Sequence, residues 1–244
     1  MRILVSNDDG VYSPGIAALA QVARKFGDVR VVAPDVERSS AGHAITASRP
    51  VRYRRTTILE GIEAYRVDGT PADCVALGAY HWDQVDVVLS GINLGPNLGN
   101  ATWHSGTLAA AKQAVLLGIR GIALSAPVSD ESADFSVLEP WVERALETLL
   151  RNEGPQLVNV NFPREPQGMR WTALAVDHYN GKIVPGTDPM GRQHYWFTVV
   201  PIEQHREGTD LWAIEHGCVS LTPLRLDLTD HEGLAAVTES IPWS

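Results

Sequence analysis

The sequence predicts an α/β fold, with a doubly wound, Rossmann-like and mostly parallel sheet and a β-rich C-terminal hairpin or arm. Through residue 125, short continuous apolar runs alternate with helical patterns. This alternation is typical of right-handed βαβ crossovers. Beyond residue 165 the pattern changes to strand-like segments separated by turn-rich stretches. The two patterns together indicate a sheet domain that carries an extension.

Uninterrupted apolar runs that end in turn residues predict buried strands. They occupy residues 2–6, 29–34, 85–90, 121–125 and 157–163. Helical patterns occupy residues 14–26, 70–80, 105–118 and 136–151. Ser13 and Thr70 are suited to N-cap the first two helices, since each precedes a proline that is suited to a first turn. Residues 44–67 predict short antiparallel strands around a turn at Glu60–Gly61.

The C-terminal extension is rich in aromatic residues and has no obvious core of its own. Trp171, Tyr195, Trp196 and Phe197 lie in its strand-like segments. A hairpin that exposes such side chains is expected to pack on another subunit. We therefore expect a Rossmann-like catalytic domain over 1–165 and a β-rich extension with an oligomerisation hairpin and tail over 166–244, within one overall domain.

The composition excludes several classes of protein. No apolar run approaches the roughly 18 residues that a membrane span needs, so no membrane partner is expected. The first residues lack the pattern of a signal peptide, which predicts a cytoplasmic location. The formal net charge of −9 disfavours a nucleic acid polymer as partner. A small phosphorylated substrate remains compatible, because a bound cation reverses the local field.

Polar residues follow three of the predicted parallel strands, in the loops 7–10, 35–40 and 91–97. Ligands bind at the carboxyl edge of such a sheet, where the strand order reverses. The loops supply Asp8 and Asp9, then Ser39, and then Asn93 and Asn97. Carboxylate, hydroxyl and amide oxygens suit Mg²⁺, Mn²⁺ or Ca²⁺. Purely structural roles as turn residues and caps remain open for each of them.

A second group of candidates surrounds the start of the helix at 105–118. Ser105 is expected to cap this helix, and Gly106 and Thr107 then offer backbone N–H groups at its positive end, which suits a phosphate group. His43 and His104 flank the loops, and each is more often a hydrogen-bonding histidine than a catalyst. The GxSxG and HExxH motifs are absent.

Five stretches in collinear order resemble the SurE survival-protein family. They are SNDDG (6–10), VVAPDVERSSAGHAIT (31–46), GTPADCV (69–75), SGINLGPNLG (90–99) and SGT (105–107). The later stretch EHGCVSLTPLRLDLT (215–229) resembles the C-terminal strand and tail of that family. Two departures lie at His104, where the family often has tyrosine, and at Asn100, where an acidic residue is common.

The resemblance implies a 5′/3′-nucleotidase, a phosphoric monoester hydrolase of acid-phosphatase type, that acts on nucleoside monophosphates with one divalent cation. On matching positions it implies Asp8, Asp9, Ser39 and Asn93 as ligands of Mg²⁺ or Mn²⁺, with Ca²⁺ also able to occupy the site. It further implies a homodimer or homotetramer with exchanged C-terminal elements, in agreement with the aromatic hairpin.

Three mechanisms stay open at this point. In the first, the cation activates a water, Asp8 or Asp9 accepts its proton, Asn97 and the helix start bind phosphoryl oxygens, and His43 or His104 assists the leaving group. In the second, an aspartate attacks phosphorus directly. In the third, the chain is a non-catalytic, metal-dependent nucleotide sensor. Short polyphosphate or another phosphomonoester is the alternative substrate.

Overall fold

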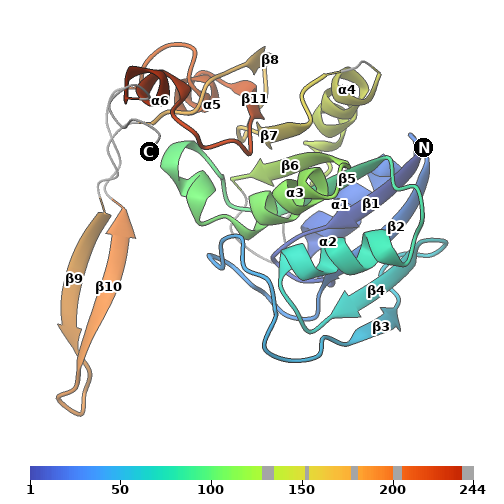
Figure 1. The fold of residues 1–244 in the computed structure, drawn as a ribbon, viewed down its shortest axis with the longest axis horizontal. Coiled ribbons are helices and arrows are strands. Elements are labelled where there is room, and N and C mark those ends of the chain that lie inside the picture. The colour runs from blue at the N-terminus through green and yellow to red at the C-terminus, as the bar shows by residue number, and fades with distance from the viewer. Residues whose placement is uncertain (128–134, 152–153, 177–180, 200–204, 238–244) are drawn as a thin grey trace, which may run out of the picture.

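The computed structural model describes residues 1–127, 135–151, 154–176, 181–199 and 205–237, and over these residues a nine-stranded sheet forms the centre of the fold (Figure 1). Its strands, in spatial order, are β3 (Tyr53–Thr56), β4 (Glu63–Val67), β2 (Asp28–Pro34), β1 (Arg2–Ser6), β5 (Val87–Leu94), β6 (Arg120–Ala126), β7 (Leu157–Asn161), β11 (Cys218–Leu224) and β8 (Gly168–Trp171). The strands from β4 to β7 are parallel. The predicted α/β fold is therefore confirmed.

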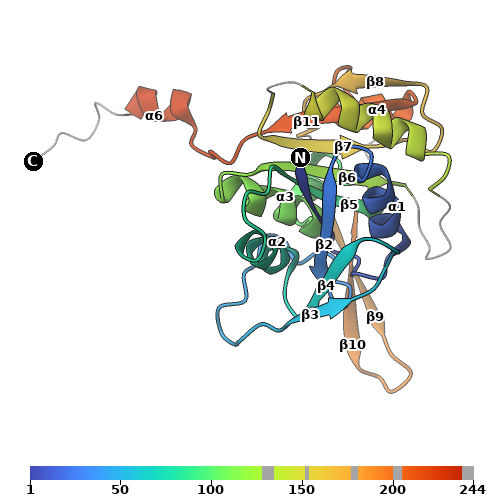
Figure 2. The ribbon, with the colours of Figure 1, turned by 90° about the vertical axis from the view of Figure 1, so that its right-hand side faces the viewer.

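Helices cover both faces of the sheet (Figure 2). One face carries α1 (Pro14–Ala23) and α4 (Glu139–Leu150), which contact each other. The other face carries α2 (Pro71–Tyr80) and α3 (Gly106–Leu116). The 3-10 helix η1 (Gly99–Trp103) precedes α3, α5 (Asp210–Glu215) packs on β11, and α6 (His231–Val237) ends the described chain. No helix of the described residues is long and apolar enough to cross a membrane.

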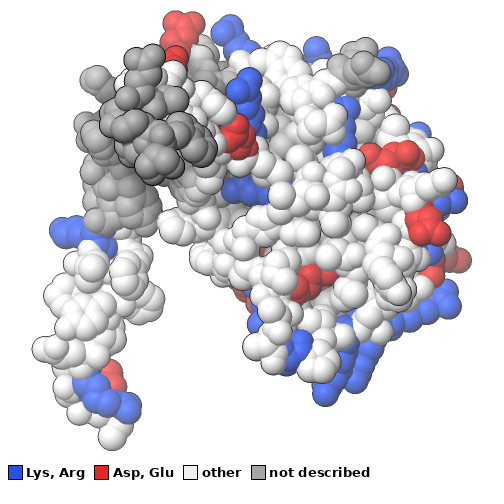
Figure 3. Space-filling view, viewed as in Figure 1, with Lys and Arg blue, Asp and Glu red and all other residues white. Residues whose placement is uncertain are grey.

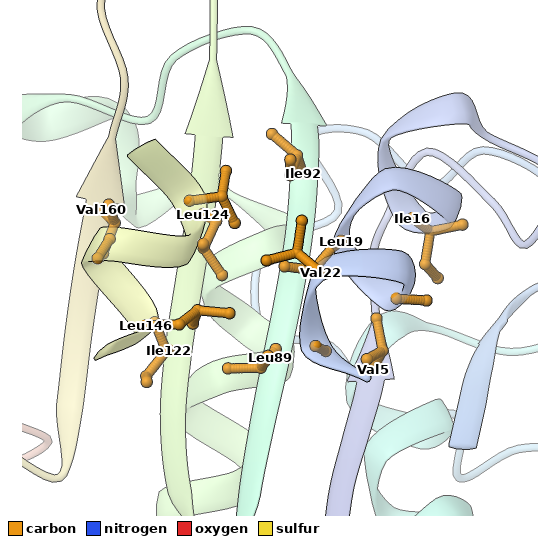
Figure 4. Packing of buried hydrophobic residues seen from close by; sticks show 14 of the residues in the cluster. Val5, Ile16, Leu19, Val22, Leu89, Ile92, Ile122, Leu124, Leu146 and Val160 are labelled. Carbon is orange, nitrogen blue, oxygen red and sulfur yellow. The ribbon is translucent and has the colours of Figure 1, made fainter. Parts of the chain in front are cut away.

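The core lies between the sheet and its helices because the central strands are apolar on both faces. Aliphatic side chains of β1, β5 and β6 interlock with those of α1 and α4 (Figure 4). Leu89, Ile122 and Leu124 are fully buried. Truncating one of these leucines to alanine would cost about 2–5 kcal/mol of stability. This packing holds the carboxyl ends of the strands in fixed relative positions.

The strand order reverses between β1 and β5. From β1 the chain proceeds to β2 and β4 on one side, and from β5 it proceeds to β6 and β7 on the other. The crevice outside the carboxyl ends of β1 and β5 is therefore the expected ligand site. Gly15 brings α1 against this crevice, since an added Cβ would lie 2.0 Å from the carbonyl oxygen of Ile92.

Several boundaries differ from those that the sequence predicts. The helix predicted over 14–26 ends at Ala23, because residues 24–26 continue as hydrogen-bonded turns. The strand predicted over 85–90 continues as β5 to Leu94, into the expected loop, because Asn93 and Leu94 pair with β6 after a register shift. The helix α5 lies where only strand-like segments were expected. Ser13 occupies the N-cap of α1 without a capping hydrogen bond, whereas Thr70 forms a full capping box.

The C-terminal region contributes to two different sheets. Strands β11 and β8 extend the central sheet next to β7. Strands β9 (Gly181–Thr187) and β10 (Gln193–Val199) form a separate antiparallel hairpin that projects from the body (Figures 1 and 2). Its surface is mostly uncharged between charged groups near its two ends (Figure 3). Tyr195, Trp196 and Phe197 are exposed there.

Candidate functional site

The turn after β1 presents two adjacent carboxylates. The side-chain amide of Asn7 donates a 3.0 Å hydrogen bond to the carbonyl oxygen of Gly10, which closes the turn around Asp8 and Asp9. Asp8 is buried, with 4% of its surface exposed, and Asp9 is half-buried. Neither forms an ion pair with a lysine, arginine or histidine of the described residues. Two neighbouring negative charges thus lack a protein counter-charge.

Asp8 faces the first turn of α3. The hydroxyl of Thr107 donates a 2.6 Å hydrogen bond to Asp8 Oδ1. Gly106 lies so close that an added Cβ would approach Asp8 Oδ2 to 2.7 Å. Burial raises the pKa of Asp8 and outweighs the lowering by its hydrogen bonds to Thr107. The positive end of α3 is therefore placed directly against this carboxylate.

Asp9 faces the extension of β5. The backbone N–H of Leu94 donates a 3.2 Å hydrogen bond to Asp9 Oδ2. Burial, and secondarily the charge of Asp8, raises the pKa of Asp9 to about 7. A raised carboxylate pKa means that the charged form is poorly stabilised by the surrounding protein. A cation between the two aspartates would supply the missing stabilisation.

The loop after β2 closes over the same turn. The backbone N–H of Arg38 donates a 2.7 Å hydrogen bond to the carbonyl oxygen of Asp8. The next residue, Ser39, is exposed, and its hydroxyl donates a 2.6 Å hydrogen bond to Glu37 Oε1. Asp9 and Ser39 line the same cavity. The structure thus brings the first and second predicted loops together.

Asn93 lies at the end of β5, one residue before the backbone N–H that contacts Asp9. Its side-chain nitrogen donates a 2.7 Å hydrogen bond to the carbonyl oxygen of Gly95. This bond fixes which end of the amide is nitrogen and which is oxygen. The third predicted loop therefore meets the first at Asp9, as the sheet topology requires.

Asn97 occupies a buried position with several hydrogen bonds. Its side-chain nitrogen donates to Ser125 Oγ at 2.8 Å and to Thr107 Oγ1 at 3.4 Å. Its carbonyl oxygen accepts hydrogen bonds from the amides of Asn159 and Asn161 on β7. Asn97 thus connects β6 and β7 to Thr107, and through Thr107 to Asp8.

The remaining candidates lie around α3. Ser105 caps the helix, since its hydroxyl accepts a 3.1 Å hydrogen bond from the backbone N–H of Leu108. The loops of His43 and His104 touch, because the Gly42 N–H donates to the His104 carbonyl oxygen at 3.1 Å. His43 Nε2 lies 2.9 Å from Gln113 Oε1. Both histidines are exposed. Neither is among the described residues that line the cavity beside Asp9.

A cavity of about 690 Å³ opens beside Asp9, between the start of α1, the loop after β2 and the end of β3. Its lining includes Tyr12, Asp35 and Glu37, which the sequence analysis does not single out. For Asp35 and Glu37, the signal in the sequence is their position after β2, in the loop that carries Ser39.

The residues at this edge fit a hard divalent cation. The described residues contain no group of three or more histidine, cysteine, aspartate or glutamate side chains placed to hold a metal ion. A cation would therefore need hydroxyl or amide oxygens beside the two aspartates, which are ligands that Mg²⁺ and Mn²⁺ accept. Ser39 and Asn93 are the residues of the second and third predicted loops that carry such oxygens.

Comparison with known proteins identifies the family. The family model described as survival protein SurE matches residues 3–181. The chain belongs to the SurE family. A SurE relative from Thermus thermophilus, named 5′-nucleotidase SurE 1, is 47% identical over 243 residues, which cover 98% of this chain and 97% of the relative. One from Deinococcus radiodurans, named 5′-nucleotidase SurE, is 43% identical and covers 99% of this chain and 93% of its own length.

A solved SurE structure has the same fold. The crystal structure of the SurE protein from Aquifex aeolicus matches with a TM-score of 0.84 and 36% sequence identity. The match covers 98% of this chain and 99% of that chain. The likeness therefore extends beyond the sheet to the C-terminal region.

Proposed function

We propose that this SurE chain is a divalent-metal-dependent nucleotidase that hydrolyses nucleoside 5′- and 3′-monophosphates to nucleoside and phosphate. The observation that carries the proposal is the pair Asp8 and Asp9 at the switch point of the sheet, two carboxylates that form no ion pair with any residue the structure describes. The relatives named 5′-nucleotidase support the reaction and the substrate class.

In this proposal Asp8, Asp9, Ser39 and Asn93 hold Mg²⁺ or Mn²⁺, and Ca²⁺ is able to occupy the same site. The bound cation would polarise the phosphoryl group and make a bound water more acidic. Asn93 would present its amide oxygen, because its nitrogen is engaged by Gly95. The four donors come from three loops that the fold holds against one another, so the site needs no rearrangement of the core.

The start of α3 is proposed to bind phosphoryl oxygens next to the cation. The Ser105 hydroxyl is engaged by Leu108, and Thr107 is engaged by Asp8. The backbone N–H of Gly106 and the positive end of the helix would then be the groups that face the phosphate. Asn97 donates to Thr107 and Ser125, so we propose that it positions Thr107 and Asp8.

Asp9 is the proposed proton acceptor for the attacking water. Asp9 is half-buried and lines the cavity, so its carboxylate borders the space that a water and a substrate could enter. His43 and His104 are assigned only a secondary role at the leaving group, since both are exposed and His43 contacts Gln113. Direct attack by an aspartate would instead leave a phosphoaspartate that acid quenching and mass spectrometry would detect.

The test is phosphate release from 5′-AMP and 3′-AMP with Mn²⁺, Mg²⁺ or Ca²⁺, against an EDTA control. We expect release with a divalent cation and none with EDTA. Asp8→Asn is expected to lower turnover at least about a hundredfold while circular dichroism stays unchanged. Binding of 5′-AMP without release of phosphate would favour the nucleotide sensor, and faster release from tripolyphosphate than from AMP would favour a polyphosphatase.

Assembly and location belong to the same proposal. We propose a homodimer or homotetramer that exchanges C-terminal elements, because the hairpin of β9 and β10 exposes Trp196 and Phe197. A cytoplasmic location and the absence of a nucleic acid polymer as partner remain predictions from the sequence pattern and the net charge.

A further inference from the structure

The cavity beside Asp9 is lined by two chemically different kinds of side chain. The polar ones include Asp9, Asp35, Glu37 and Ser39. The apolar ones are mainly Val11, Tyr12, Pro14, Val36, Ile58 and Leu94. Its volume of about 690 Å³ is within the usual range of sites for small molecules. Of the two aspartates proposed to hold the cation, Asp9 lines this space, so a substrate whose phosphate lies beside Asp9 could extend its remaining part into the cavity.

Tyr12 is the one large aromatic side chain among the described residues that line the cavity. It keeps 62% of its surface exposed, yet its hydroxyl lies 2.8 Å from Thr56 Oγ1 at the end of β3. This hydrogen bond ties the far end of the ring to the sheet. An exposed ring that is held in place provides a ready surface for stacking. Val36, which also lines the cavity, is 54% exposed.

The charge of the cavity restricts what can enter it. Its ionisable carboxylates are Asp9, Asp35 and Glu37, and no lysine or arginine is among the described residues that line it. One carboxylate oxygen of Asp35 is buried without a hydrogen-bond partner and lies 4.0 Å from a guanidinium nitrogen of Arg38. A lining with three carboxylates favours neutral groups that donate hydrogen bonds, such as sugar hydroxyls. It disfavours phosphate groups beyond the one that a cation at Asp8 and Asp9 would neutralise.

We infer that this cavity binds the nucleoside part of a nucleoside 5′-monophosphate, with the base stacked on Tyr12 and the ribose hydroxyls toward Asp35 and Glu37, in preference to a polyphosphate chain. The inference rests on the proposed function and adds to it the residue that recognises the base. Stacking on an aromatic side chain is tolerant of base identity, because every base has a π-face. The enzyme is therefore expected to accept purine and pyrimidine monophosphates alike.

The test compares Tyr12→Ala with wild type on two substrates, 5′-AMP and ribose 5-phosphate, in the presence of Mn²⁺. These substrates share the phosphate and the ribose and differ only in the base. We expect Tyr12→Ala to raise the KM for 5′-AMP about tenfold with little change in kcat, because stacking is lost equally in the ground and transition states. The KM for ribose 5-phosphate should change less than about twofold.

Two further variants make the result specific. Tyr12→Phe keeps the ring and should retain a KM for 5′-AMP within about threefold of wild type. Tyr80→Ala removes a tyrosine from α2 that is 79% exposed and lies outside the cavity lining, and it should change the KM for neither substrate. Thermal unfolding of each variant shows whether the fold is intact.

The outcomes separate the two proposals. If wild type releases no phosphate from either substrate, the proposed function fails. If wild type is active but Tyr12→Ala affects both substrates equally, or neither, the nucleotidase proposal stands and base recognition by Tyr12 is wrong. A higher kcat/KM for tripolyphosphate than for 5′-AMP in wild type would overturn the charge argument.

Discussion

The hydroxyl of Thr107 donates a 2.6 Å hydrogen bond to Asp8 Oδ1, which joins the first turn of α3 to the turn after β1. Both residues are buried. A single buried donor thus orients the carboxylate that we propose as a metal ligand.

Thr107→Val removes this donor and keeps the shape of the side chain. We expect phosphate release from 5′-AMP to fall about tenfold to a hundredfold, because ligands that lose an orienting hydrogen bond bind metal less well. The apparent Mn²⁺ affinity, measured by titrating activity, should fall with it. Thr107→Ser restores the hydroxyl and should recover most of the activity. Full activity in Thr107→Val would show that this bond has no part in catalysis.

Gly106→Ala places a methyl group against the carboxylate. The added Cβ would lie 2.7 Å from Asp8 Oδ2, so either α3 or Asp8 must move. We expect phosphate release and Mn²⁺ affinity to fall at least about tenfold, because metal sites tolerate little displacement of a ligand. Gly168→Ala is the matched control, since its added Cβ meets nothing closer than Cys218 Sγ at 3.8 Å. Equal activity of the two variants would contradict the close approach.

Asp9 gives the metal-free protein a stability that depends on pH. Burial and the charge of Asp8 raise its pKa from 3.8 to about 7, so between these values the folded state holds a proton that the unfolded state has lost. The free energy of unfolding therefore falls as the pH rises from 4 to 7. Above pH 7 the whole cost of burying the charged Asp9 carboxylate is present, and the free energy of unfolding stays at its lower value. In EDTA, Asp9→Asn should unfold several degrees above wild type at pH 8 and gain little at pH 4. An equal gain at both pH values would argue against the raised pKa.

The hairpin of β9 and β10 is expected to hold the assembly together. Trp196 and Phe197 are 65% and 82% exposed, an unfavourable arrangement for large apolar rings unless a partner covers them. The double variant Trp196→Ser, Phe197→Ser should shift the molar mass measured by light scattering toward that of a single chain. Tyr80→Ser, at an exposed position on α2, serves as the control. A wild type that is already a single chain would refute the assembly.

The architecture of the sheet could be predicted from the sequence because its signals are local. Continuous apolar runs such as 2–6 and 121–125 are buried strands in the structure, and Pro71 after Thr70 begins a helix as expected. The extension of β5 could not be predicted, since Gly91 and Gly95 are typical of a loop and only pairing with β6 keeps Asn93 in the sheet.

For the site too, the features that depend on local signals and topology could be predicted, and those that depend on non-local contacts could not. The meeting of the loops after β1, β2 and β5 follows from topology, and the structure joins them through Arg38 and Leu94. The place of Tyr12 in the cavity lining could not be predicted, because its position depends on a hydrogen bond to Thr56, forty-four residues away in the chain. Non-local side-chain contacts of this kind leave no periodic pattern in a sequence.

The asparagine connections beneath the site couple distant parts of the chain. Asn159 and Asn161 on β7 hold the backbone of Asn97, whose side chain reaches Thr107 and so the first aspartate. The orientation of the Asp8 side chain thus depends on residues that are synthesised about 150 positions after it. A fragment that stops before β7 would keep both aspartates and lose the scaffold that aligns them, so the site at β1 depends on a strand three places away in the sheet.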